Sequence, residues 1–159
     1  MDIKAKKILI ACYQGNNGGD GFVAAKYLSE FAEVDILFIG DEQKFKEATK
    51  INYKKAVDNH KIQFIDVDGN FDDYDIIIDA ILGTGVTGRI KDSIRNIILR
   101  INETNAYKVS VDIPTGLNPE TGQVDDIIVN PDLIITFHDL KTGLKNYQNK
   151  IEIIDIGIR

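Results

Sequence analysis

The chain has 159 residues, 43% hydrophobic and 28% charged, which is the size of one ordinary domain and the composition of a globular protein. Acidic residues outnumber Lys and Arg by 25 to 19, and the net charge of −6 argues against nonspecific binding to nucleic acid or to an anionic membrane. The N-terminus lacks an apolar secretory core and no run could cross a bilayer, so we expect a cytoplasmic protein with one domain over residues 1–159.

Short apolar runs alternate with longer amphipathic segments along the chain. Several runs, such as Ile76–Ile78 and Leu133–Ile135, are apolar without alternation, which is typical of strands buried on both faces of a mainly parallel sheet. The predicted strands are residues 7–13, 34–39, 62–65, 75–82, 108–111, 133–137 and 151–156.

Three segments between the predicted strands have helical periodicity. The first, residues 20–31, places an apolar stripe on Val23, Ala24, Tyr27, Leu28 and Phe31. Two further helices are predicted around residues 45–51 and over 91–101, whereas residues 112–131 contain all three prolines and should form an irregular excursion. This order predicts an α/β fold with a doubly wound sheet flanked by helices.

Glycine-rich and polar clusters follow four of the predicted strands. They cover residues 15–21 (GNNGGDG), 79–89, 112–117 and 136–144. In doubly wound sheets, ligands bind beyond the carboxyl ends of the strands, so the four clusters predict a single site at one edge of the sheet.

The first cluster departs from the common nucleotide-binding motifs. A Walker A loop needs Gly-Lys-Ser/Thr, which does not occur, although residues 19–24 fit a relaxed dinucleotide pattern and Asp41 lies near the place of a ribose-binding acid. Asp20 stands between the two phosphate-facing glycines and would repel a pyrophosphate unless it turned away to cap the helix. A standard dehydrogenase site is therefore not expected.

The same clusters contain oxygen donors suited to a cation. Asn17, Asp79 and Thr115 could converge on a cation of low charge density, with loop carbonyls completing the shell. An alternative stays open from the pattern alone: Asp79 accepts hydrogen bonds from loop amides, and Asn17 only tolerates a left-handed turn.

The motifs together resemble the YjeF N-terminal domain family, whose enzymatic members are NAD(P)HX epimerases. The resemblance lies in residues 16–21, 83–85, 111–117, 136–144 and 155–158, in order over nearly the whole chain, and the first and third motifs together are quite specific. It implies a three-layer αβα Rossmann-like fold and an isomerase that interconverts the R and S epimers of hydrated NADH or NADPH.

The resemblance also implies the residues of the site. Potassium (K+) would bind at Asn17, Asp79 and Thr115, where Thr115 replaces the usual serine and keeps its hydroxyl. We expect Asp112 to act as the acid and base, with Lys141 orienting Asp112 or the substrate. Asp20 should be either a helix cap or a group that positions the ligand. The implied substrate contacts are Asn16, Asn17, Gly18, Gly19, Asp20, Gly83, Thr84, Gly85, Val86, Thr87, Gly88, Arg89 and Asp112.

The implied partners are a dinucleotide substrate, NADHX or NADPHX, and a separate NAD(P)HX dehydratase that acts on one epimer in the same pathway.

Family enzymes carry a helical segment before the first strand that contributes to a homodimer and to the pocket, whereas only residues 1–6 precede the first predicted strand here. Some relatives use the fold without catalysis, so the alternative function is a nucleotide-binding or assembly module. Of the other polar residues, His60 should lie in a solvated loop, while ligand contacts of His138 and Arg89 stay open.

Overall fold

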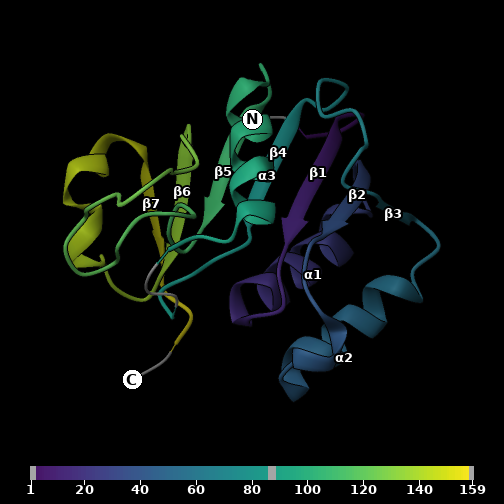
Figure 1. Ribbon diagram of the computed structural model, residues 1–159. Helices are drawn as coiled ribbons and strands as arrows, with labels where there is room; N and C mark the ends of the chain where they lie inside the picture. Colours follow the sequence, from purple (N-terminus) through teal and green to yellow (C-terminus); the bar gives the residue numbers. More distant parts are fainter. Residues whose placement is uncertain (1–2, 86–88, 158–159) are drawn as a thin grey trace.

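The protein is described by a computed structural model, which covers residues 3–85 and 89–157. The strands of these residues form one parallel sheet in the order β3-β2-β1-β4-β5-β6-β7 (Figure 1). The strands are β1 Lys7–Cys12, β2 Glu33–Phe38, β3 Ile62–Ile65, β4 Ile76–Ala80, β5 Tyr107–Val111, β6 Leu133–Phe137 and β7 Ile151–Ile154. Each strand overlaps a predicted one, and the predicted parallel α/β sheet is confirmed.

Helices cover both faces of the sheet, with α1 and α2 on one side and α3 on the other (Figure 1). The α-helices are α1 Asn16–Leu28, α2 Glu47–Val57 and α3 Asp92–Glu103, and the 3-10 helices are η1 Glu42–Lys44 and η2 Thr142–Lys150. None of the helices in the described ranges has the length and apolar character that crossing a membrane requires.

The central strands bury side chains on both faces. In β1, Ile8 and Ile10 pack in the same cluster as Phe22 of α1, whereas Leu9 packs in the cluster of Ile97 and its neighbours on α3. Successive strand residues point to opposite faces, so a strand between two helical layers needs apolar residues at every position. This explains the unbroken apolar runs of the sequence.

The first helix begins four residues earlier than predicted. It starts at Asn16, so the Asn-Asn-Gly-Gly segment is helical. The N-cap is Gly15, which has no side chain that could form a capping hydrogen bond. Asp20 lies in the second turn of α1, so the prediction that it caps the helix is wrong.

The buried face of α1 also differs from the predicted apolar stripe. Tyr27 and Phe31 are 63% and 58% exposed, while Gly18, Gly21 and Phe22 are buried. The reason is close backbone packing: a Cβ at Gly21 would lie 2.6 Å from the Cys12 sulfur and 2.7 Å from the Ala80 Cβ. The face that packs on β1 and β4 is therefore marked by glycines together with Phe22, and not by Tyr27 and Phe31.

The direction in which strands are added reverses between β1 and β4. The chain runs outward from β1 through β2 to β3 and then returns to the other side of β1 at β4. In open α/β sheets a crevice forms beyond the carboxyl ends of the strands at such a reversal. Residues 112–132, after β5, contain no helix or strand beyond an isolated bridge between Leu117 and Val124, so the predicted excursion is confirmed.

Candidate functional site

A cavity of about 460 Å³ lies at this reversal, beyond the ends of β1, β4 and β5. It collects residues from the start of α1, from the loop after β4 and from the end of β5. The predicted substrate residues in its wall are Asn16, Asn17, Asp20, Gly83, Thr84, Gly85 and Asp112. Three of the four sequence clusters thus contribute to one cavity.

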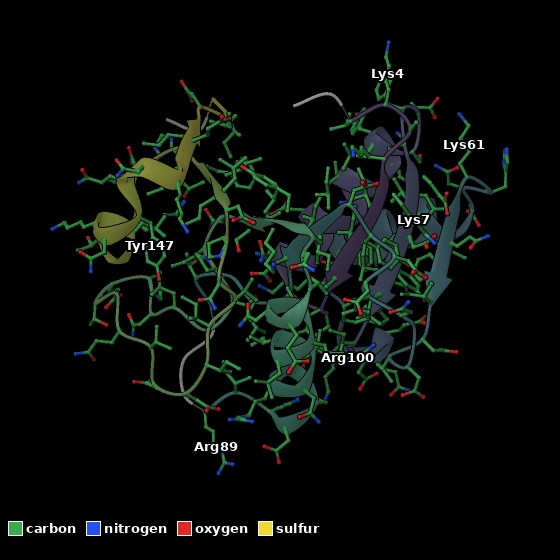
Figure 2. The ribbon with its side chains drawn as sticks, turned by 90° about the horizontal axis from the view of Figure 1, so that it is seen from above. Lys4, Lys7, Lys61, Arg89, Arg100 and Tyr147 are labelled. Carbon is green, nitrogen blue, oxygen red and sulfur yellow. The ribbon has the colours of Figure 1, made fainter. Side chains whose placement is uncertain are left out.

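Other predicted substrate residues lie elsewhere. Gly18 and Gly19 are buried in α1 and do not line the cavity, and a Cβ at Gly18 would lie 1.7 Å from the Tyr13 carbonyl oxygen. Arg89 forms an ion pair with Asp92 at 3.6 Å, its side chain is 84% exposed, and Figure 2 shows it extending outward from the molecule. The predicted contacts at Val86, Thr87 and Gly88 fall outside the described residues.

Asn17 is a buried amide without a partner among the described residues. Its residue is 6% exposed, and within residues 3–85 and 89–157 neither its side-chain oxygen nor its side-chain nitrogen has a hydrogen-bond partner. It packs beside the loop after β4, since a Cβ at Gly83 would lie 3.3 Å from the Asn17 Cβ. Buried polar atoms are nearly always hydrogen-bonded, so this side chain points to a ligand.

Asp79 ends β4 as a buried carboxylate that accepts several hydrogen bonds. One oxygen accepts from the Ser110 hydroxyl at 2.9 Å and the Thr115 amide at 2.8 Å, and the other accepts from the Thr115 hydroxyl at 2.6 Å. Burial raises the pKa of Asp79, although the hydrogen bonds from Thr115 and Ser110 oppose this shift. The carboxylate would gain from a nearby positive charge.

The three predicted ion ligands gather around the same loop. The Thr115 hydroxyl oxygen accepts from the Leu82 amide at 3.0 Å and contacts Asp79, while Asn17 packs against Gly83. In the part of the chain that the structure describes, no three His, Cys, Asp or Glu side chains cluster as metal ligands. The donors are therefore one carboxylate and neutral oxygens, a set that fits potassium better than a transition metal.

Asp112 is held at the end of β5 by a network from β6 and the segment after it. Its backbone has the uncommon φ of 65°, and its carboxylate accepts from Lys141 at 2.5 Å and from the Thr136 hydroxyl at 3.2 Å. Lys141 also donates to the Thr136 hydroxyl at 3.0 Å and to the Phe137 carbonyl at 2.8 Å. Asp tolerates a positive φ better than most residues, and these bonds fix the direction of its carboxylate.

Thr136 and Ser110 were missed as supporting residues by the sequence reasoning. Both are fully buried and bind a site carboxylate, Thr136 through Asp112 and Ser110 through Asp79. A hydroxyl residue between two apolar residues of a strand is the signal that could have identified them. Of the histidines, His60 is exposed, as expected, and His138 pairs with Asp139 at 3.4 Å and does not line the cavity.

Both the sequence and the fold of this chain are similar to those of known proteins. The family described as "YjeF-related protein N-terminus" matches residues 1–143. The "Bifunctional NAD(P)H-hydrate repair enzyme Nnr" of Methanothermobacter thermautotrophicus is 41% identical over 98% of this chain, and the "NAD(P)H-hydrate epimerase" of Nitrosopumilus maritimus is 35% identical over 90%. The "NAD(P)H-hydrate epimerase" of Cenarchaeum symbiosum is 35% identical over 97% of this chain.

The relatives differ in length. This chain spans 68% and 76% of the two epimerases, but only about a third of the bifunctional relatives, 33% in M. thermautotrophicus. Among solved structures, the yeast protein YNL200c superimposes with a TM-score of 0.81 over 96% of this chain and 66% of its own. At 23% identity that likeness supports the fold alone.

Proposed function

Since the chain belongs to the family of YjeF-related protein N-termini, we propose that it is an NAD(P)H-hydrate epimerase, an isomerase that interconverts the R and S epimers of hydrated NADH and NADPH. The observation that carries the proposal is the Asp112 carboxylate, held by Lys141 in the wall of the cavity at the strand reversal. The proposal is supported by two relatives that are named NAD(P)H-hydrate epimerase, each of which this chain matches over more than two thirds of its length.

The proposed role of Asp112 follows from the chemistry of the reaction. Epimerisation must loosen the bond between the hydrated carbon and its hydroxyl, or open the ring, and then restore the bond on the other face. Either route moves a proton at that oxygen or at the ring nitrogen, and a positioned carboxyl group can serve as acid and base. Lys141 and Thr136 would hold Asp112 in place during both directions of transfer.

Other residues of the cavity would bind the dinucleotide. The start of α1 presents backbone N–H groups at Asn16 and Asn17, where a phosphate group is favoured by the unpaired amides and by the helix dipole. Lys46 lines the same cavity and adds a positive charge. Gly83, Thr84 and Gly85 form a wall with little side-chain bulk.

We also propose that Asn17, Asp79 and Thr115 hold a potassium ion. The support is the unpartnered Asn17 amide beside a buried carboxylate and a buried hydroxyl. When bound, the ion would supply positive charge that offsets the Asp79 carboxylate, while the three side chains would tie α1, β4 and the segment after β5 together.

The proposed pathway includes a separate NAD(P)HX dehydratase that consumes one epimer. Relatives about three times as long as this chain are named bifunctional repair enzymes, which supports a second activity on the same substrate. A cytoplasmic location and a homodimer stay predictions.

The test is to incubate the purified protein in potassium buffer with separated R and S epimers of NADHX or NADPHX, and to follow them by chromatography. We expect each epimer to approach the equilibrium mixture faster than it does spontaneously, without nucleoside triphosphate and without net oxidation. Binding of the dinucleotide with only the spontaneous drift would indicate the non-catalytic module instead. Oxidation or reduction of the nicotinamide would favour a dehydrogenase.

A further inference from the structure

A second carboxyl group faces the cavity that contains Asp112. Asp20, one turn into α1 after Asn16, lines the same cavity as Asp112 at the end of β5. The two carboxyl groups differ in their partners: that of Asp112 accepts from Lys141, whereas the side chain of Asp20 has no hydrogen bond or ion pair with any residue in 3–85 or 89–157. Asp20 is therefore neither a cap nor a structural ion-pair partner.

The surroundings of Asp20 are apolar on one side. Asp20 also borders a hollow of about 600 Å³ over the sheet, lined by side chains such as Val111 and Phe137. Among the described residues, Glu152 is the only other charged residue in its lining. Partial burial, and then the charge of Asp112, raise the pKa of the Asp20 carboxyl above its ordinary value.

The charged groups around Asp20 come from several elements. Lys46 at the N-cap of α2 shares the cavity, Lys141 is engaged by Asp112, and Glu152 of β7 lies in the apolar hollow. Neither lysine forms an ion pair with Asp20. Two carboxyl groups that share a cavity, one with an ammonium partner and one without, are suited to opposite protonation states.

Building on the proposed epimerase function, we propose that Asp20 is a second catalytic residue, the acid that protonates the ring nitrogen of the hydrate while Asp112 acts as the base at its hydroxyl. The pair faces one cavity from α1 and β5, so a ring bound between them can meet both groups. Catalytic sites often contain such pairs, in which different environments separate the acid from the base.

The step balances with these two groups alone. The Asp112 carboxylate takes the hydroxyl proton, the O–H electron pair forms a carbonyl bond, and the carbon–nitrogen ring bond breaks. Its electron pair goes to the ring nitrogen, which takes the proton of Asp20. After rotation about the bond next to the carbonyl carbon, Asp20 takes back the N–H proton, the nitrogen attacks the other carbonyl face, and Asp112 returns its proton to the oxygen. No oxidant, reductant or water is consumed.

The experiment compares kcat and KM for epimer interconversion by the wild-type protein, Asp20→Asn, Asp20→Glu and the control Glu152→Gln. We expect Asp20→Asn to lower kcat by about 10²–10⁴-fold with little change in KM, because an amide cannot supply the proton. Asp20→Glu should restore part of kcat, and Glu152→Gln should behave like the wild type. Within the described part of the chain the Asp20 side chain has no hydrogen-bond or ion-pair partner, so the variants should unfold at the wild-type temperature.

A pH profile separates proton transfer from simple binding. Asp20 must be protonated to act, so wild-type kcat should fall as the pH rises above the pKa of Asp20 in the complex, and Asp20→Asn should lack this fall. An Asp20→Asn variant with wild-type kcat, or with a loss confined to KM, would overturn the inference and leave the epimerase function standing. A wild-type protein that does not accelerate epimerisation would overturn the proposed function and this inference with it.

Discussion

Replacing Asn17 with Leu should change stability in opposite directions with and without potassium. Leu has the branched shape of Asn without its polar atoms, and the Asn17 oxygen and nitrogen are both buried without a partner in the residues that the structure describes. An unsatisfied buried polar group costs about 1–3 kcal/mol. Without a bound ion, Asn17→Leu should therefore raise the free energy of unfolding by about 1–3 kcal/mol. In a domain of this size, each kcal/mol raises Tm by about 2–4 °C.

Potassium should reverse this order. An ion that binds only the folded protein adds about 4.1 kcal/mol at about one thousand times its Kd, which exceeds the whole deficit of about 1–3 kcal/mol. The wild-type protein should gain this stabilisation, whereas Asn17→Leu, which lacks a ligand oxygen, should gain little. Under these conditions the wild type becomes at least as stable as the variant.

The assay is urea unfolding at constant ionic strength, with either potassium or tetramethylammonium as the only added cation. Asn96→Leu, at an exposed position of α3, controls for the general effect of replacing Asn by Leu. If the wild type unfolds at the same urea concentration with both cations, or if Asn17→Leu shows the same potassium shift as the wild type, Asn17 is not an ion ligand.

Two further predictions concern the packing of α1 on the sheet and the hydrogen bond between Tyr74 and the buried Asp35 carboxylate. Gly21→Ala should destabilise the protein by about 1–3 kcal/mol in urea unfolding, because the added methyl group would overlap side chains of β1 and β4, whereas Gly85→Ala, with open space around it, should be close to neutral. Tyr74→Phe should cost about 1.5–3 kcal/mol at neutral pH, because the hydroxyl donates to the buried Asp35 carboxylate at 2.6 Å. Burial and this bond raise the pKa of Tyr74 from its model-compound value of 10.0. The contribution of the Tyr74 hydroxyl to stability should thus be complete below pH 10.0 and be lost as the pH rises through the higher pKa of the folded state. If the stability of the variant and of the wild type depended on pH in the same way, this account would be contradicted.

The sheet and the position of the cavity could be predicted because both follow from local patterns. Strands buried on both faces are visible as unbroken apolar runs, and the carboxyl ends of parallel strands must meet at one edge. The sequence alone therefore predicts that the clusters containing Asp79 and Asp112 lie close together. Their hydrogen bonds to Ser110 and Thr136 depend on side-chain directions across neighbouring strands, which one sequence does not specify.

The error at α1 has a different physical cause. The apolar period of residues 20–31 indicates an amphipathic helix. The glycine at position 21, however, allows its backbone to approach β1 and β4 more closely than any large side chain would permit, and Gly18 allows a close approach to Tyr13, just after β1. Burial at this contact is achieved through the backbone, so the hydrophobic pattern points to the wrong face. The large side chains of Tyr27 and Phe31 are consequently left exposed.

The most direct test of the central claim is the rate of epimer interconversion by the wild-type protein and by Asp112→Asn, measured from a single purified epimer of NADHX in potassium buffer. Asn keeps the shape of the side chain and tolerates the positive φ of this position, so the variant should fold and bind the dinucleotide. We predict that the wild type accelerates interconversion and that Asp112→Asn is slower by about 10²–10⁴-fold. A folded Asp112→Asn protein that epimerises at nearly the wild-type rate would contradict the account.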